Sequence, residues 1–407
     1  MGNLIGKAVY LYCAIISELA CTLVNLFTRA GNHTDGVRKR LLIIRTDLIG
    51  DFILFLGSFR AYRRLYPEGH YEITLLGNKS WGELAEEAGL ADHYIFIDPD
   101  KFYKKFLYKF RVLKMIRKIG FDIAVHPVYS RAFEMGDAVI RVSGAKERIG
   151  STGDLTNTSG LRKFWADRFY TRLVSAAPGE IPELERQAEF LRNIGLADFK
   201  ASCPRLDIAP IKIAAMAEKF GLPEKYYILF PCASRPLRQW PVEKFAKLAN
   251  HLYEKTGWTG IIAGGPGGPD REIGEKLRGQ TGAPLIDLTG KTSIFELACI
   301  IASSKLLAGN ETSGIHIAAA TGIPVLCILG GGQYGRCFPY GDPEKNRFVT
   351  HQMDCFGCNW RCIYKYGENE PVPCIREVSE TEVFGVADEM VEAIENTGGK
   401  NTDSPLP

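Results

Sequence analysis

The chain has 407 residues, of which 46% are hydrophobic and 24% are charged, and its net charge is +3. This length predicts two domains of ordinary size, and the composition is that of a globular protein. The small net charge argues against a nucleic-acid-binding protein. Several of the eleven cysteines lie in apolar runs and look like core positions of a reduced protein, which argues against a disulfide framework.

The chain opens with an apolar segment, residues 4–27, whose only charged side chains are Lys7 and Glu18. Its apolar residues recur with helical spacing and form an unusually broad stripe. We predict an interfacial helix with a linker, together residues 1–37, and a helix packed on the protein's own surface is the alternative. No convincing signal-peptide cleavage site follows, and the basic run 38–40 favours a cytoplasmic flank. These features predict a cytoplasmic protein that is peripheral on the inner face of the membrane.

Beyond this segment, apolar runs at residues 41–44, 71–76, 94–97 and 123–125 alternate with helix-like stretches. Continuous apolar strands with helices between them predict a parallel sheet that is covered on both faces. We place this first Rossmann-like domain at residues 38–207, with a less regular second half.

The first predicted strand runs into the motif Arg45-Thr46-Asp47-Leu48-Ile49-Gly50-Asp51, and a helix follows. A carboxylate at a helix N-terminus is favoured by the helix dipole, so Asp51 taken alone reads as a helix-capping residue. The same position also suits a proton acceptor that faces a ligand at the strand ends.

Residues 101–120 read as one basic amphipathic helix. Its charge suits a phosphorylated lipid surface or acceptor, and an ordinary solvated helix face is the alternative. The basic side chains expected largely away from its apolar face are Lys104, Lys105, Lys109, Arg111, Lys114, Arg117 and Lys118.

A second alternating series fills residues 208–395, which we assign to a second Rossmann-like domain. The fold class is therefore α/β with two doubly wound domains, in which ligands bind beyond the carboxyl ends of the strands. The tail, residues 396–407, is expected to be disordered. The apolar runs of the second series lie at residues 227–230, 260–263, 285–288, 306–308 and 325–329, with a helix expected at 242–256.

Segment 310–324 places small hydroxyl residues where a strand ends and a helix begins. Thr312, Ser313 and Gly314 bring hydroxyls and unpaired backbone N–H groups to the positive end of that helix. This arrangement predicts an anion cradle that suits a diphosphate.

Segment 231–241 carries two further candidates for binding phosphate. The Ser234 hydroxyl can donate to a phosphate oxygen, and the Arg238 guanidinium offers a fixed fork of donors. A surface arginine stacked on Trp240 is the alternative for Arg238.

Loop 355–374 contains a cluster of cysteines, Cys355, Cys358, Cys362 and Cys374. These are enough thiols for a tetrahedral structural zinc site. Reduced thiols packed in the protein, a disulfide and an iron–sulfur cluster remain alternatives.

Together, the motifs at 45–51, 231–241 and 310–324 resemble, in order, those of glycosyltransferase family 9, the heptosyltransferase family of lipopolysaccharide assembly. The resemblance spans roughly residues 41–340. It implies GT-B architecture, with an acceptor domain and a nucleotide-sugar domain facing an interdomain cleft. It also implies an inverting, metal-independent transferase that needs no cofactor. The implied partners are a nucleotide-diphosphate sugar, with ADP-heptose favoured, and a lipid-linked or core-oligosaccharide acceptor.

The resemblance also implies roles for single residues. Asp51 becomes the general base, and Ser234, Arg238 and the 312–314 turn hold the donor diphosphate. Glu311, which stands where the family has Asp, and His316 are candidates for contacts with the nucleotide or ribose. The alternatives are a contact of Glu311 with the turn alone and a purely structural hydrogen bond for His316. The Gly-rich turn that follows the run 260–263 adds further candidates for the same role, with solvated loop residues as the alternative. These candidates are Gly264, Gly265, Asp270 and Glu272.

Two other functions remain open from the sequence. A nucleotide-sugar epimerase of the same two-domain shape would consume donor without acceptor. A non-catalytic sugar-nucleotide-binding protein would bind donor and yield no product.

Overall fold

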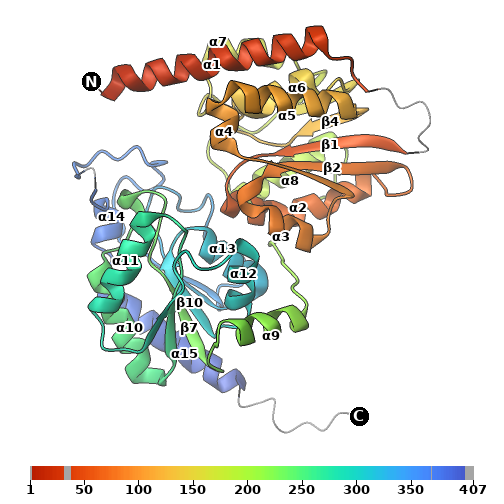
Figure 1. The fold of residues 1–407 in the computed structure, drawn as a ribbon. Helices are drawn as coiled ribbons and strands as arrows, with labels where there is room; N and C mark the ends of the chain where they lie inside the picture. Colours follow the sequence, from red (N-terminus) through yellow and green to blue (C-terminus); the bar gives the residue numbers. More distant parts are fainter. Residues whose placement is uncertain (1, 32–37, 368, 399–407) are drawn as a thin grey trace, which may run out of the picture. The chain divides into compact units, whose positions relative to one another are not determined.

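The computed structural model describes residues 2–31, 38–367 and 369–398 and divides the chain into two compact units (Figure 1). Unit 1 comprises Met1–Glu180 and Leu184–Ser202, and unit 2 comprises Ile181–Glu183 and Cys203–Pro407. The main division therefore falls at Ser202, five residues before the expected boundary. Residues 32–37 of the expected linker and 399–407 of the expected tail lie outside the described residues.

Unit 1 is built on a six-stranded sheet with the order β3-β2-β1-β4-β5-β6, in which every neighbouring pair is parallel. Helices α2 and α3 cover one face, and α4, α5 and α6 cover the other (Figure 1). The strands are β1 Lys39–Arg45, β2 Tyr71–Asn78, β3 His93–Ile97, β4 Ile123–His126, β5 Glu147–Ser151 and β6 Arg172–Val174. The helices are α1 Gly2–Phe27, α2 Ile49–Leu65, η1 Lys79–Trp81, α3 Gly82–Ala88, α4 Pro99–Lys104, α5 Phe106–Ile119, the π-helix η2 Phe133–Asp137, α6 Ala138–Val142, α7 Gly160–Asp167 and α8 Glu183–Ile194.

Unit 2 repeats this plan with the order β12-β11-β10-β7-β8-β9. Both orders are the 3-2-1-4-5-6 arrangement of the dinucleotide-binding fold, which confirms the expected fold class. The strands are β7 Tyr226–Phe230, β8 Thr259–Ile262, β9 Leu285–Asp287, β10 Leu306–Asn310, β11 Val325–Ile328 and β12 Asn346–Val349. The helices are α9 Pro210–Lys219, η3 Pro236–Arg238, α10 Val242–Thr256, α11 Gly268–Gly279, α12 Ile294–Ala302, α13 Ser313–Thr321, α14 Pro373–Arg376 and α15 Glu380–Gly398.

The central strands form where the sequence has unbroken apolar runs. The side chains of Leu41 to Ile44 in β1 and of Tyr226 to Leu229 in β7 are almost wholly buried, as expected for strands covered on both faces. Three strands were not anticipated, β5 and β6 in unit 1 and β12 in unit 2. They are short and carry charged residues such as Glu147, Arg172 and Arg347, which weaken the apolar signal. Helix α15 continues to Gly398 and so includes the first residues of the expected tail.

Helix α1 packs against α5 and α6. Ala20 and Val24 are buried in this contact, whereas Leu11, Ile15 and Leu19 are exposed on the opposite side. Among the described residues, no helix combines the length and the apolar character needed to cross a bilayer.

The single basic helix expected at 101–120 is wrong, because the chain forms two helices there. Asp98 caps α4 and Pro99 occupies its first turn, while Lys105 takes an extended conformation with φ −113° and ψ 102° that separates α4 from α5. Lys109 is also not on a solvated face, since it is fully buried.

Candidate active site

The first candidate residue, Asp51, lies in the first turn of α2 directly after the turn that follows β1. The N-cap position is Leu48, which makes no side-chain capping hydrogen bond, so Asp51 is not the capping residue. The turn is fixed by the buried Arg45, whose Nε lies 2.7 Å from Asp47 Oδ2 and whose Nη2 donates to the Asp51 carbonyl oxygen. Asp51 is partly buried at the carboxyl edge of the sheet.

A cavity of about 830 Å³ lies beside this turn, within unit 1. It lies at the carboxyl ends of β1 to β4, which is where ligands bind in doubly wound sheets. Asp51 is not among its lining residues, but Leu48, the N-cap of the same helix, is. The lining is rich in hydroxyl, amide and charged groups of the kind that bind sugars. Its polar members include Thr46, Asp47, Asn78, Lys79, Ser80, Asp98, Lys101, Tyr103, His126, Ser130 and Asn157.

His126 forms one wall of this cavity and belongs to a buried network. Its Nδ1 lies 2.8 Å from the Tyr170 hydroxyl, which donates to Asp137 Oδ1 at 2.6 Å, and Arg131 donates to the same carboxylate. Burial lowers the pKa of His126, so the ring is held neutral. A Cβ on Gly136 of the π-helix would lie 2.2 Å from the His126 ring, so this wall requires glycine there. The sequence did not single out this network.

In unit 2, Asn310 joins the two segments that were expected to bind diphosphate. Its Nδ2 donates to the Pro231 carbonyl oxygen at 2.6 Å, and its Oδ1 accepts from the Trp240 backbone N–H at 2.9 Å. Segments 231–241 and 310–324 are therefore held together at the carboxyl ends of β7 and β10. Ser234 in the first segment is exposed.

The turn into α13 has the form expected of an anion cradle. Thr312 is the N-cap and makes no side-chain capping hydrogen bond, while its hydroxyl donates to the Asn310 carbonyl oxygen at 3.2 Å. A Cβ on Gly314 would lie 2.7 Å from the Phe230 ring, which explains the glycine after Ser313. The first N–H groups of a helix have no partners within the helix, so this end can bind an anion.

Arg238 lies next to this turn, but its guanidinium is not a solvated charge. Its Nη2 donates to the carbonyl oxygen and a carboxylate oxygen of Glu311 and to Gln333 Oε1 at 2.9 Å. The side chain is 18% exposed. Within the part of the chain that the structure describes, Nε and Nη1 make no hydrogen bonds, so the N–H groups of these two nitrogens can still bind a ligand oxygen.

Glu311 and His316 are bonded to each other rather than projecting freely. Glu311 Oε1 lies 3.1 Å from His316 Nε2, and His316 Nδ1 lies 3.0 Å from the Tyr340 hydroxyl. The longer side chain of Glu311 thus connects Arg238 to His316. The contacts with nucleotide or ribose assigned to these two residues remain predictions.

In the glycine-rich turn after β8, one of the candidate ribose-binding residues, Asp270, is hydrogen-bonded within the turn itself. Asp270 Oδ2 accepts from the Gly265 backbone N–H at 2.8 Å, and burial raises the pKa of this carboxyl group. Gly264 is packed against Cys232, and Glu272 is exposed on α11. A ribose contact for these residues remains a prediction.

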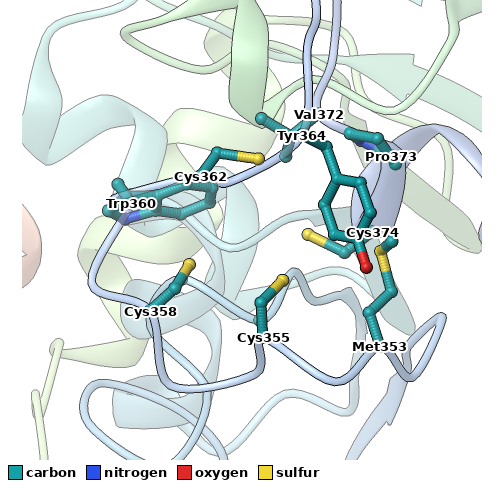
Figure 2. Close-up of a pocket in the computed structure, with 11 residues that line it drawn as sticks. Met353, Cys355, Cys358, Trp360, Cys362, Tyr364, Val372, Pro373 and Cys374 are labelled. Atoms are coloured by element: carbon teal, nitrogen blue, oxygen red, sulfur yellow. The ribbon is translucent and has the colours of Figure 1, made fainter.

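The four clustered thiols line one small pocket, together with Met353, Trp360 and Tyr364 (Figure 2). All four cysteines are free thiols, and Cys374 is buried. Burial, and after it the nearby Cys358 and Cys362, raise the pKa of Cys355. As they are placed, no group of three or more Cys, His, Asp or Glu side chains among the described residues is arranged to hold a metal ion.

Sequence reasoning missed two residues that touch Arg238, namely Gln333 and Trp360. The ring centroid of Trp360 lies 5.2 Å from the Arg238 Cζ. The run Gly330-Gly331-Gly332 was the available signal, because glycines at a strand end allow another loop to approach closely.

Known proteins resemble this chain in sequence and in fold. A family model described as glycosyltransferase family 9 (heptosyltransferase) matches residues 139–361. The chain is 23% identical over 286 residues to lipopolysaccharide heptosyltransferase 3 of Escherichia coli, an alignment that covers 69% of this chain and 80% of that protein. It is 27% identical over 150 residues to lipopolysaccharide heptosyltransferase 3 of E. coli strain K12. That alignment covers 36% of this chain and 43% of the relative, so it spans less than half of the relative's length.

Solved structures of low sequence identity share the fold. A glycosyltransferase family 9 protein from Veillonella parvula has a TM-score of 0.69 at 20% identity, covering 88% of this chain and 98% of that one. The ADP-heptose lipopolysaccharide heptosyltransferase II of E. coli has a TM-score of 0.65 at 15% identity, covering 88% and 99%.

Proposed function

Because this chain belongs to glycosyltransferase family 9, we propose that it is an inverting glycosyltransferase that moves a sugar from a nucleotide diphosphate donor to a surface-glycan acceptor. The proposal rests on one observation. The N-terminus of α13, where Thr312 is the N-cap residue, lies next to Arg238, whose Nε and Nη1 make no hydrogen bonds among the described residues. The names of the relatives favour heptose as the sugar, ADP-heptose as the donor and the lipopolysaccharide core as the acceptor. The family match does not favour the epimerase alternative.

In the proposed reaction, an acceptor hydroxyl oxygen attacks the anomeric carbon of the donor sugar. The bond from that carbon to the diphosphate oxygen breaks, and the nucleoside diphosphate leaves with the electron pair. Asp51 takes the hydroxyl proton on the face opposite the leaving group, which inverts the anomeric centre. Arg238, Ser234, the Ser313 hydroxyl and the first N–H groups of α13 stabilise the charge that builds on the leaving diphosphate. The Thr312 hydroxyl joins them when it rotates away from the Asn310 carbonyl oxygen.

We assign the acceptor to the cavity of unit 1. Its lining of hydroxyl, amide and carboxylate groups can exchange hydrogen bonds with sugar hydroxyls, and it adjoins the turn that carries Asp51.

The proposal is tested with Asp51→Asn and a panel of nucleotide sugars. A general base typically contributes 10²- to 10⁴-fold, so the turnover of this variant should fall by about that factor while its affinity for donor stays within about twofold. Asp198→Asn is the matched control, because Asp198 lies in the same unit, is solvent-exposed and paired with Arg64, and does not line the cavity. This control should retain activity.

Other outcomes separate the alternatives. Loss of donor binding in Asp51→Asn would assign that residue a structural role. An isomerised sugar nucleotide in an acceptor-free incubation would identify an epimerase, and saturable donor binding with no product from any acceptor would identify a binding protein.

We also propose that the protein is cytoplasmic and that unit 1 binds peripherally to the inner face of the membrane. Two exposed apolar surfaces support it, the outer side of α1 and one side of α7, where Leu161, Phe164 and Trp165 are exposed next to Lys163 and other basic residues. Aromatic and aliphatic groups beside basic ones are typical of helices that lie in a membrane interface. Flotation with phosphatidylglycerol vesicles should be lost in Phe164→Ser/Trp165→Ser.

For the cysteine loop, residues 355–374, we propose a structural zinc ion. The four thiols would bind it after their side chains rotate toward one another. The support is that four thiols, the usual number of ligands for structural zinc, border a single pocket. Purified protein should contain about one zinc per chain by elemental analysis, and Cys358→Ser/Cys362→Ser should contain none. Metal-free wild-type protein that unfolds at the same temperature with and without added zinc would favour packed, reduced thiols.

A further inference from the structure

The guanidinium of Arg238 is touched by a residue of the cysteine loop that belongs to none of the donor motifs. The Cζ atom lies 5.2 Å from the ring centroid of Trp360, within the range of a cation–π interaction. Hydrogen bonds from Nη2 to Glu311 and Gln333 hold one edge of the same group. The Arg238 guanidinium is thus hydrogen-bonded along one edge and packed against an aromatic ring on one face. The residues that make these two contacts come from different loops.

Trp360 has a backbone conformation and a side-chain environment that are unfavourable for tryptophan. Asn359 and Trp360 have φ values of 49° and 60°, and they are the two positive-φ residues other than glycine among those the structure describes. The Trp360 indole N–H is buried and has no acceptor within the described part of the chain. Both features are unfavourable for folding, and such features persist where the surroundings require a particular placing of the side chain.

The surroundings do require it. A Cβ on Gly332 would lie 2.4 Å from the Trp360 ring, so the loop after β11 is shaped to receive the indole. Arg336 Nη1 donates to Asn359 Oδ1 at 3.2 Å, and the Gly357 N–H donates to the Gly331 carbonyl oxygen at 2.9 Å. The two loops therefore form one packed body that contacts Arg238 through Gln333 and Trp360.

We propose that Trp360 is a positioning residue for donor binding, and that it acts through Arg238. The indole face holds the guanidinium in the orientation that leaves Nε and Nη1 directed to a diphosphate. The inference rests on the proposed function, because it takes Arg238 to bind the donor diphosphate. Cys358 and Cys362 flank Trp360 at two residues on either side (Figure 2), so whatever constrains those thiols also constrains the ring.

The test is a double-mutant cycle read by calorimetric titration with the tightest binder among ADP, UDP and GDP. A cation–π contact of this kind predicts that Trp360→Leu raises the Kd by about three- to tenfold and that Trp360→Phe raises it less. In an Arg238→Ala background, Trp360→Leu should cause no further change. In transfer assays, Trp360→Leu should lower kcat/KM for the donor, because Arg238 also stabilises the charge on the leaving diphosphate, and Phe356→Leu should not.

The matched control is Phe356→Leu. Phe356 lies in the same loop and packs on Gly331 and Tyr334, but it does not touch Arg238. The Phe356→Leu substitution likewise removes an aromatic ring that packs within this loop, so a merely structural role for Trp360 would make the two variants alike in both Kd and thermal stability.

The outcomes separate this inference from the proposed function. If Arg238→Ala leaves the nucleotide Kd unchanged, or if wild-type protein binds no nucleoside diphosphate, the donor role of Arg238 fails and the inference fails with it. If Arg238→Ala weakens binding but Trp360→Leu has no effect, or adds its full effect in the Arg238→Ala background, Trp360 does not act through Arg238 and the proposed function stands.

Discussion

Replacing Lys109 by methionine should stabilise this protein at neutral pH. The Lys109 ammonium is fully buried beneath α1 and η2, where its Nζ donates to the Glu134 carbonyl oxygen at 2.7 Å and lies 4.7 Å from the Phe102 ring centroid. Burial lowers its pKa from 10.5 to about 8, although nearby Cys21 and Glu134 favour the charged form. Methionine has nearly the same shape and carries no charge to bury.

The expected size of the effect follows from the pKa. A fall from 10.5 to about 8 corresponds to about 3 kcal/mol of destabilisation while lysine is charged in both states, at ~1.4 kcal/mol per pH unit. Losing the hydrogen bond and the cation–π contact should cost about 1–2 kcal/mol. Lys109→Met is therefore expected to be more stable than wild type by about 1–2 kcal/mol at pH 7.

The sign of the pH dependence follows from the protons bound. Between pH 8 and 10.5 the unfolded chain holds a proton on Lys109 that the folded chain has released, so the stability of wild type gains from this residue as pH rises through that window. Methionine does not titrate. The advantage of the variant should thus shrink by about 2 kcal/mol between pH 7 and pH 9.5.

Urea unfolding of wild type and variant at both pH values measures this difference. Lys118→Met is the control, since Lys118 is exposed on the same helix, and it should change stability little at either pH. A Lys109→Met variant that is less stable than wild type at pH 7, or whose advantage does not depend on pH, would refute the reasoning.

Three further predictions concern the two binding regions. Gly332→Ala should displace Trp360 and raise the Kd for nucleoside diphosphate about as much as Trp360→Leu, because a Cβ there would lie 2.4 Å from the ring; titration calorimetry compares the two. Arg238→Lys keeps the charge but lacks the fork, so the same titration should give a Kd raised by about tenfold, and an unchanged Kd would argue against binding through Nε and Nη1. Gly136→Ala should push the His126 ring and raise the acceptor KM in transfer assays, and an accompanying change in donor Kd would contradict an acceptor site in unit 1.

The fold class and the order of the candidate site segments could be predicted from the amino-acid sequence alone. Apolar runs such as 41–44 and 227–230 can satisfy their backbone only in a sheet covered on both faces, so their alternation with helices was enough to predict two parallel α/β units. The positions of Asp51 and of the 312–314 turn at helix starts after strands were also predicted from sequence, because a helix start is a local feature that depends on neighbouring residues. The short, charged strands β5, β6 and β12 were not predicted from the sequence, because their formation depends on pairing with strands that are distant in the chain.

The hydrogen-bonding partners of the candidate residues could not be predicted, because they depend on how distant segments pack. Nothing local in the sequence indicates that Glu311 would bond both Arg238 and His316, or that Trp360 would lie against Arg238 from more than a hundred residues away. Lys109 shows the same limit, since periodicity placed it on a solvated face while the packing of α1 and η2 buried it. Helical spacing shows which residues share a face, but burial, hydrogen bonding and pKa are set by which distant elements cover that face.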